Sequence, residues 1–539
     1  MMKNKLSVRK SSFVEGTFIA TLAIIFTKFL GILYVIPFYK MVGAKGSALY
    51  AYAYTIYVIF LDISTAGLPI AISKVVNEYD TLKQNEDKIR TYYIARRIMM
   101  LVSIIVFLFM FINSSTIAEF LIGDLTNGNS VSDATLVIKI ISLSILVVPY
   151  LSVGKGYLQG HSIINISSIS QVIEQVVRIL VILGGSYLCI YVFKTGIVSA
   201  ICVSLLGAFI SGLVAYFFVN RKIKNVIDKQ YKYKYDKLTD KDIIKKIFKY
   251  AIPYIIINVI SSLYNFIDMS LILKTLNYLK YETPLIEFAT SSITTWAPKI
   301  NMIVSSIAMG MSMSLIPAMV SSYTLKDMKE VCSKVNQAIG IILYISIPLC
   351  MFIYCFSNHI WNIFYGYSIE GSIILKFSII YALLINIYMT VSTILQGLNK
   401  FKIVYILTGV GFLLNGILDV PLMILFNYLG FNAYLGAIFS TIIGYSVSII
   451  IGLLSLKKEC SISYKNTFIN GFKIIVVSFI VMSILYISKH IYNVSVLSKI
   501  NSIIYVIIEG VLGVVLYIYI TFKLKIIKEI FKRKNLSKR

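Results

Sequence analysis

The chain has 539 residues, of which 58% are apolar and only 14% are charged. This composition excludes a soluble globular protein, and apolar runs of about twenty residues recur along the whole length, which predicts membrane-spanning helices. The runs do not alternate at a period of two residues, which argues against a membrane barrel. A net charge of +27 would suggest nucleic-acid binding in a soluble chain. Here the cations gather between the apolar runs, so membrane topology explains them better.

The sequence carries no signature of an enzyme or a metal protein. The six cysteines form no CxxC pair, and the three histidines are too scattered in sequence to form a ligand set. The patterns GxxxxGK[ST], GxSxG and HExxH do not occur. We therefore expect a transporter without a cofactor, driven by an ion gradient, by the membrane potential or by substrate supply.

In chain order, a basic segment at 3–10 precedes the first apolar run, 13–39, which is too long for the core of a signal peptide. About fourteen spans of this kind follow one another, which predicts a polytopic all-α membrane protein. If the N-terminus is cytoplasmic, most lysines and arginines fall on the cytoplasmic side, above all in 221–249 and 523–539. An even number of spans then places both termini in the cytoplasm.

Short motifs recur in the two halves of the chain. Leu158-Gln159-Gly160 follows the fourth span and Leu395-Gln396-Gly397 follows the tenth, while Gly67-Leu68-Pro69 and Leu315-Ile316-Pro317 end the second and eighth spans. The offsets of roughly 240 residues favour two six-helix lobes related by a parallel pseudo-twofold repeat. We predict an N-lobe at 1–220, a basic cytoplasmic linker at 221–246, a C-lobe at 247–456, two further spans within 457–522 and a basic cytoplasmic tail at 523–539.

Lys28 lies near the middle of the first span, where a lysine side chain cannot easily reach either membrane surface. A charge at this depth costs about 2.5–3.5 kcal/mol on insertion scales, so it normally faces a polar cavity. Lys28 therefore indicates an anionic group on the transported molecule. The structural alternative is an ion pair with Asp62 on the neighbouring span.

The fifth span, 164–187, carries a second polar set. Gln171, Glu174, Gln175 and Arg178 have the helical spacing i, i+3, i+4 and i+7, so they share one face. This face either lines a cavity, with the charge of Arg178 tempered by Glu174, or forms a buried ion pair that holds the lobe together.

The second half of the chain offers further candidates. Asn265 and Asp268 are one turn apart on the seventh span and could bind a coupling cation or proton, or form a hydrogen-bonding pair between helices. Lys299 lies near one end of the eighth span, where it either lines the cavity or extends to the interface. The remaining polar residues within these spans are Asn258, Asn415, Asp419 and Glu509.

A series of motifs, concentrated in the first 180 residues, resembles a known family. They are Thr27-Lys28-Phe29-Leu30-Gly31, Ile36-Pro37-Phe38-Tyr39, Gly43-Ala44-Lys45-Gly46, Tyr50-Ala51-Tyr52, Ile63-Ser64-Thr65-Ala66-Gly67-Leu68-Pro69 to Ser73-Lys74, and Gln159-Gly160 followed by Ser170-Gln171-Val172-Ile173-Glu174-Gln175 and Arg178. These motifs are similar to those of the MurJ and SpoVB/YtgP-type lipid flippases of the multidrug/oligosaccharidyl-lipid/polysaccharide exporter superfamily. The resemblance extends over essentially the whole chain.

The resemblance implies a V-shaped, two-lobed flippase of the bacterial plasma membrane. Its expected cargo is an undecaprenyl-pyrophosphate-linked saccharide, above all the peptidoglycan precursor lipid II, moved to the outer leaflet by alternating access. Lys28 matches a cationic position of the family's first helix and would contact the pyrophosphate, with Arg178 and Lys299 as further cations. The prenyl tail would lie along a groove beside the last two spans. Tyr34 and Asp62 stand where the Gram-negative branch has arginines, so the family's contacts cannot be transferred intact.

Three alternatives remain open. The same architecture would suit a flippase for capsule or teichoic-type repeat units, which differ only in the sugar. A cation-coupled multidrug exporter usually presents carboxylates to cationic drugs, whereas the first helix here carries a lysine. A scaffold for wall synthesis would not need buried charges. We expect a monomer, no nucleic-acid partner, and the cell-wall synthesis machinery as the candidate protein partner.

Overall fold

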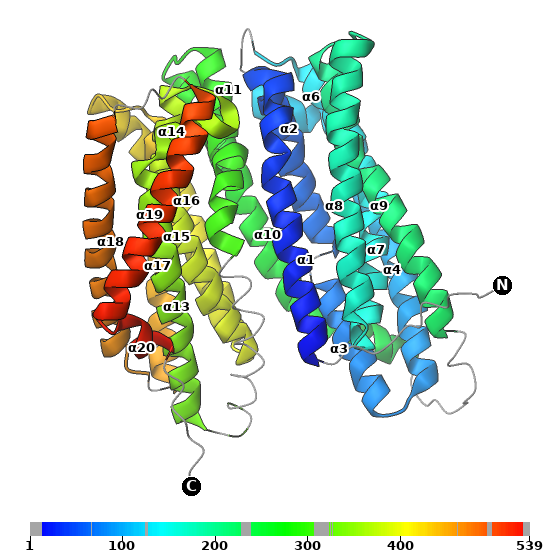
Figure 1. The fold of residues 1–539 in the computed structure, drawn as a ribbon. Coiled ribbons are helices and arrows are strands. Elements are labelled where there is room, and N and C mark those ends of the chain that lie inside the picture. The colour runs from blue at the N-terminus through cyan, green and yellow to red at the C-terminus, as the bar shows by residue number, and fades with distance from the viewer. Residues whose placement is uncertain are drawn as a thin grey trace, which may run out of the picture. The chain divides into compact units, whose positions relative to one another are not determined.

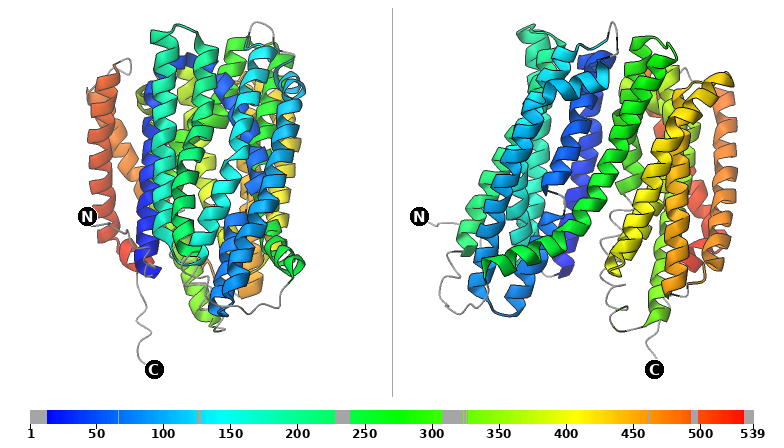
Figure 2. Two further views of the ribbon diagram at one scale, coloured as in Figure 1. Left: turned by 90° about the vertical axis from the view of Figure 1, so that its right-hand side faces the viewer. Right: turned by 180° about the vertical axis from the view of Figure 1, so that it is seen from behind.

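The computed structural model describes residues 13–531 except 66, 124, 126–127, 228–238, 307–322, 324, 326, 461 and 493–497. All regular elements in these described ranges are helices, which confirms the predicted all-α class (Figures 1 and 2). Contacts between Cα atoms group the chain into two compact units, Met1–Ser291 and Ser292–Arg539.

Twelve helices within the described residues are long and apolar enough to cross a membrane. The predicted first span is not one of these twelve helices. Its apolar part within the described side chains, Leu22–Leu33, is shorter. The predicted eighth span, 291–318, lies partly outside the described residues. The multi-pass class is therefore confirmed, and the count of fourteen stays a prediction.

Unit 1 contains the helices up to residue 291. Their bounds are α1 (Phe13–Leu33), α2 (Val35–Thr65), α3 (Leu68–Thr81), α4 (Asn85–Ile112), α5 (Ser114–Ile122), α6 (Val131–Ser142), η1 (Leu143–Leu146), α7 (Val148–Gly160), α8 (Ile164–Tyr187), η2 (Leu188–Val192), α9 (Ile197–Ile227), α10 (Asp240–Tyr278) and α11 (Thr283–Ser291). Helix α10 packs against α2, α3 and α4, so it groups with unit 1, although we predicted that this span opens the second lobe. Packing contacts and internal repeats are different properties, and the six-plus-six organisation stays a prediction.

Unit 2 contains η3 (Ser292–Trp296), α13 (Met328–Cys355), α14 (Ser357–Tyr365), α15 (Ile369–Gly397), α16 (Phe401–Tyr428), α17 (Tyr434–Cys460), α18 (Lys465–Tyr492), α19 (Lys499–Lys523) and α20 (Ile526–Phe531). Helix α19 exposes Val511, Val514, Val515 and Ile518, each with at least half of its surface accessible. Large apolar side chains in such positions suit contact with lipid.

The break between α2 and α3 follows from the Gly67-Leu68-Pro69 motif. Gly67 adopts a left-handed backbone conformation with φ of 75°, which glycine tolerates at no steric cost, and proline stands within the first turn of α3. A Cβ at Gly67 would also lie only 2.5 Å from Cβ of Tyr254. The glycine therefore serves both the turn and the close approach of α10.

Ion pairs connect the first turns of α10 to α3 and α4. The guanidinium of Arg90 pairs with Asp240, and Nζ of Lys246 lies 2.5 Å from Oε1 of Glu78. Thr239 and Asp242 form a capping box, which satisfies backbone N–H groups at the start of this helix.

A hydrogen-bond network around Asn129 joins three segments in another part of unit 1. Glu287 of α11 is 4% exposed, and its Oε1 accepts hydrogen bonds from the backbone N–H (2.7 Å) and the side-chain amide (2.9 Å) of Asn129. The same amide also donates to the carbonyl of Lys45 on α2 at 3.0 Å. Burial raises the pKa of the Glu287 carboxyl, against the opposing effect of the Asn129 hydrogen bonds.

This hydrogen-bond network predicts that two substitutions of Glu287 differ in their effect on stability. Glu287→Ala leaves the N–H groups of Asn129 without their acceptor, which should lower the free energy of unfolding by about 1–3 kcal/mol. Glu287→Gln keeps an oxygen acceptor and removes the charge, so its effect should be smaller. Thermal unfolding of the purified protein measures both.

The pH dependence of stability is the control for this prediction. An acid whose pKa is raised in the folded state loses stability as pH rises from its usual value of 4.5 towards the folded pKa. The wild type should therefore lose stability relative to Glu287→Gln over that rise. Equal damage by the Gln and Ala variants would contradict the role of the Asn129 contacts.

Candidate functional site

Lys28 lies on α1, and its side chain is half-buried. One turn further along, α1 meets α8, since a Cβ at Gly31 would lie 3.4 Å from Nε2 of Gln175. Figure 1 shows these two helices side by side. The polar face predicted for the fifth span therefore includes a residue that contacts the lysine-bearing helix.

The two helices run in the same direction, because three crossing segments, Val35–Thr81, Glu86–Ile112 and Val131–Gly160, separate them in the chain. Counting one turn in each direction from the Gly31–Gln175 contact puts Lys28 at the level of Gln171 and Tyr34 at the level of Arg178. Gln171 is exposed, and Tyr34 is buried. Lys28 thus lies about two turns from Arg178 along the helix axes.

Glu174 binds two cations at once. Its Oε2 lies 2.9 Å from Nζ of Lys155, and its Oε1 lies 2.8 Å from Nη2 of Arg178. The three side chains are 19%, 15% and 23% exposed in the order Lys155, Glu174, Arg178. Two cations and one carboxylate leave this cluster with a net positive charge. The Glu174–Arg178 ion pair that we considered from the sequence is present, with a third member that we had not predicted.

The sequence did contain a signal for Lys155. It lies within the fourth predicted span, with glycine on both sides. A Cβ at Gly156 would lie 2.7 Å from the carbonyl oxygen of Pro69 on α3, and one at Gly154 would lie 2.8 Å from a methyl group of Val219 on α9. The flanking glycines therefore let α7 pack closely against both neighbours, which fixes the backbone that carries the lysine.

Tyrosines of α2 lie close to Arg178. The rings of Tyr50 and Tyr54 stack with centroids 5.7 Å apart, and the centroid of Tyr57 is 6.0 Å from that of Tyr54. All three tyrosines are within electrostatic range of the guanidinium. Tyr50 and Tyr57 are buried and Tyr54 is half-buried, so among these three tyrosines Tyr54 is the accessible one.

The carboxylate of Asp62 on α2 is half-buried and accepts a hydrogen bond from the hydroxyl of Ser262 on α10. The interaction that the structure gives Asp62 is therefore with a neutral donor. An ion pair between Asp62 and Lys28 stays a prediction.

The other candidates are distributed over both units. On α10, Asn265 is exposed and Asp268 is buried. Lys299 belongs to unit 2, where it follows η3 and is half-buried. Among the described residues there is no group of three histidine, cysteine or carboxylate side chains that could hold a metal ion.

Two polar residues that we identified within predicted spans meet in unit 2. Ser440 of α17 donates to the carboxylate of Asp419 on α16 and lies 3.1 Å from Oδ1 of Asn415. All three side chains are buried. This cluster joins α16 to α17 inside the apolar packing.

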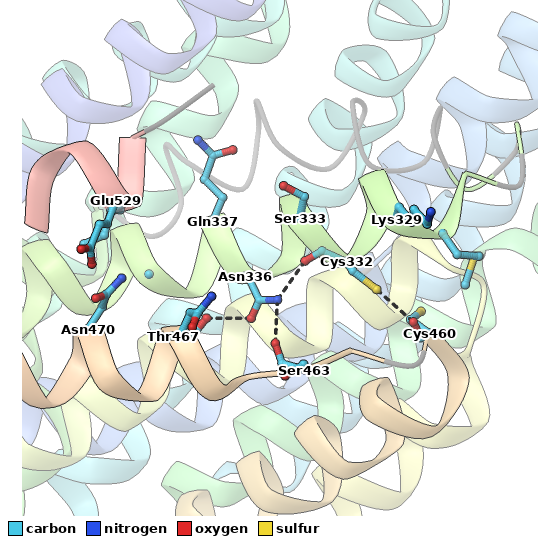
Figure 3. Close-up of a pocket in the computed structure, with 14 residues that line it drawn as sticks. Lys329, Cys332, Ser333, Asn336, Gln337, Cys460, Ser463, Thr467, Asn470 and Glu529 are labelled. Atoms are coloured by element: carbon cyan, nitrogen blue, oxygen red, sulfur yellow. Dashed lines mark hydrogen bonds between the residues drawn. The ribbon is translucent and has the colours of Figure 1, made fainter. Parts of the chain in front are cut away.

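Unit 2 also has a polar pocket with a volume of about 680 Å³ between α13, α18 and α20 (Figure 3). Asn336 is central to it, since its amide donates to the carbonyls of Cys332 and Ser463, and its oxygen accepts from Thr467 at 2.7 Å. These bonds connect α13 with the segment that begins α18. The pocket is rich in amides and hydroxyls, whereas the cluster around Glu174 is charged.

A second pocket of about 680 Å³ in unit 2 is almost wholly apolar. It lies between α13, α18 and α19, and Phe352, Met482 and Val511 are among its lining residues. Gly510 and Gly513 of α19 also line it, and their lack of side chains leaves room along that helix. The shape and chemistry suit a hydrocarbon chain.

Solved structures define the class of protein. The fold matches a multidrug resistance MATE family transporter in an inward-facing conformation with a TM-score of 0.64 and 18% identity, covering 82% of this chain and 98% of that chain. It matches the lipid II flippase MurJ in an inward closed conformation with a TM-score of 0.67 and 17% identity, covering 94% and 99%. The chain therefore has the fold of these multi-pass membrane transporters.

Sequence comparison gives the family. The model of the polysaccharide biosynthesis protein family matches residues 13–323, and the MatE model matches residues 253–420. The lipid II flippase MurJ of Bacillus subtilis (strain 168) is 31% identical over 466 residues, which cover 84% of each chain. Stage V sporulation protein B of the same organism is 25% identical over 392 residues, 72% of this chain and 74% of that protein.

The chain belongs to the polysaccharide biosynthesis protein family, among its MurJ-like flippases. The resemblance found in the sequence motifs is thereby confirmed. The expectation of a transporter and not an enzyme is confirmed with it.

The contact between Asp62 and Ser262 predicts that Ser262→Ala destabilises the protein. A half-buried carboxylate would lose its hydroxyl donor, which should cost about 1–3 kcal/mol in thermal unfolding. Ser261→Ala is the matched control, because the bond that the Ser261 hydroxyl makes among the described residues is to the carbonyl of Ile257 within its own helix. Equal stability of the two variants would show that the Asp62 contact contributes little.

Proposed function

We propose that the protein moves an undecaprenyl-pyrophosphate-linked saccharide, above all lipid II, from the cytoplasmic to the outer leaflet by alternating access. The observation that supports this most directly is the net positive cluster of Lys155, Glu174 and Arg178, with Lys28 on the adjoining helix. A diphosphate and a sugar head group cannot cross hydrocarbon unaided, since burying an unpaired charge costs many kcal/mol. Cations along a polar path replace water around the phosphates with charge-assisted hydrogen bonds.

Lys28 is proposed to attract the pyrophosphate, with Arg178 as a second cation of unit 1 and Lys299 as a contribution from unit 2. Gln171, at the level of Lys28, and Tyr54, near Arg178, would meet the sugar. Asp62 and Glu174 moderate the positive charge, which keeps binding reversible. For coupling to a cation or proton, Asn265 and Asp268 remain the candidates.

The positive charge of the cluster also helps to distinguish the proposed flippase from the alternative functions. A binding site for cationic drugs would need an excess of carboxylates, whereas here two cations share one. Capsule or teichoic-type repeat units present the same phosphate chemistry, so a flippase for them stays the alternative. Genes for glycosyltransferases beside this one would favour that alternative.

We further propose that the protein lies in the bacterial plasma membrane as a monomer, with both termini and the segment 221–249 in the cytoplasm. The basic composition of this segment and of the tail supports that orientation. Contact with cell-wall synthesis enzymes is proposed on the nature of the cargo alone.

The apolar pocket between α13, α18 and α19 is the proposed location of the prenyl tail. Keeping the tail in an apolar groove avoids moving it through the polar path. The head group alone would then cross between leaflets.

The first prediction concerns Lys28. Lys28→Ala should lose complementation of a strain depleted of its own lipid II flippase, and transport of a defined lipid-linked saccharide in proteoliposomes should fall roughly 10–100-fold, since one charge-assisted contact is worth about 1.5–3 kcal/mol. Lys28→Arg keeps the charge and should retain part of the activity.

Lys139→Ala is the matched control, because Lys139 lies on α6, and its Nζ is 5.6 Å from the ring centroid of Phe111 on α4. Protein levels in the membrane should be equal in all variants. Full complementation by Lys28→Ala would refute the proposed role, and absence of transport by the wild type, with and without membrane potential, would refute the function itself.

The second prediction concerns the apolar pocket. Gly510→Leu should fill the space beside Phe352, whose Cζ lies 3.6 Å from the position of a Cβ at residue 510. Transport of a cargo with a long prenyl tail should fall severalfold, while a short-tailed analogue should be affected much less. Gly409→Leu on α16 is the control, since nothing lies within 4 Å of a Cβ there. Equal loss for both tail lengths would place the tail elsewhere.

A further inference from the structure

The arrangement around Glu174 resembles an anion site that already holds an anion. One carboxylate bridges two cations from different helices, and each cation binds a different oxygen, at 2.9 Å for Lys155 and 2.8 Å for Arg178. A phosphate group has the same ability to bridge, with more oxygens to offer.

We propose that Lys155 and Arg178 form a phosphate subsite for the cargo, and that Glu174 occupies this subsite in the empty protein as a displaceable counter-anion. The proposal rests on the proposed function, because it names the residues that receive one phosphate of the lipid-linked cargo. It adds Lys155 to the substrate contacts and gives Glu174 a role in specificity.

The donors of Arg178 are incompletely used. A guanidinium has five N–H donors, and the structure gives a hydrogen bond from Nη2 to Glu174. Nε of Arg178 is buried and has no hydrogen-bond partner in the described part of the chain. A buried donor without an acceptor costs free energy, and a phosphate oxygen would supply what the single carboxylate does not.

Glu174 shares α8 with Arg178, whereas Lys155 lies on α7. Lys155 is carried by a helix packed tightly through Gly154 and Gly156, and the polar face of α8 meets α1 at Gly31. Glu174 and Arg178 are one turn apart on α8, so rotation of the Glu174 side chain can vacate the subsite without any movement of the helices.

Internal competition by Glu174 would set both specificity and affinity. Neutral and cationic lipids cannot replace a carboxylate between two cations, whereas a phosphate can. Phosphate can bind only those molecules in which Glu174 has left the site. The apparent affinity is therefore the intrinsic affinity multiplied by that fraction. Weaker binding of this kind suits a transporter, which must release its cargo on the other side.

The test measures binding of fluorescent farnesyl diphosphate and farnesyl monophosphate to the full-length protein in nanodiscs of a neutral lipid. Glu174→Gln removes the competing charge and should bind the diphosphate roughly tenfold more tightly. Lys155→Gln should bind it roughly tenfold more weakly, and Lys155→Arg should restore most of the affinity. Lys139→Gln, which removes one charge elsewhere in unit 1, should bind as the wild type does.

The gain for Glu174→Gln is judged together with the loss for Lys155→Gln and its recovery in Lys155→Arg, because removal of a carboxylate raises anion affinity by charge alone, whereas a shared phosphate subsite also requires the cation at position 155. Thermal unfolding confirms that each variant is folded, and if Lys155→Gln is not, the Glu174→Gln and Lys155→Arg variants still decide. Unchanged or weaker binding by Glu174→Gln would overturn the displaceable role, and wild-type affinity in folded Lys155→Gln would overturn the subsite.

Failure of the phosphate subsite can be distinguished from failure of the proposed transport function. A wild-type protein that transports a lipid-linked saccharide, together with a Lys155→Gln variant that binds normally, would overturn the subsite alone. A wild-type protein that neither transports that lipid nor binds either farnesyl phosphate would overturn both.

Discussion

The shared carboxylate of Glu174 is the interaction on which the polar interior of unit 1 depends. Two cations without a counter-charge would be unstable at this depth in a low-dielectric environment, and a fully neutralised set would offer nothing to an anion. Three charged groups of unequal sign meet both requirements, since the cluster is held together by its own ion pairs and keeps an excess of one positive charge. The surrounding helices supply close packing and hydroxyl groups, and the ion pairs that the described residues form in this cluster involve no carboxylate besides Glu174.

The proposed role of this cluster follows from the chemistry of the proposed cargo. The family's cargo, as proposed here, combines a strongly hydrated head with a long hydrocarbon chain, and the two need different environments at the same time. The structure has charged and hydroxylated groups in unit 1 and an apolar pocket in unit 2. The charged cluster of unit 1 and the apolar pocket of unit 2 would thus serve the two parts of the proposed cargo.

The sequence predicted the features that depend on local pattern. Apolar runs gave the helical class, the Gly67-Leu68-Pro69 motif marked the break between α2 and α3, and the spacing of Glu174 and Arg178 predicted their pairing. It did not predict the partners that come from distant segments, such as Ser262 for Asp62 or Asn129 for Glu287, because these depend on how helices pack and not on periodicity. Lys155 was missed although a lysine inside an apolar span is itself a signal, because its partner Glu174 lies on a different helix.

The glycines on either side of Lys155 also bear on how the protein moves. With almost no space between α7 and the backbone of α3 on one side and the side chains of α9 on the other, these helices can slide past one another only at the cost of steric overlap. They should therefore travel as one rigid block during the transport cycle, with Lys155 fixed in it. Helix α8 belongs to the same block, since a Cβ at Gly207 of α9 would lie 3.3 Å from the carbonyl oxygen of Arg178, and one at Gly185 of α8 would lie 2.3 Å from a methyl group of Val203. The separation between Lys155 and Arg178 should therefore stay constant during turnover, so spectroscopic labels on α7 and α8 would follow the movement of a single body.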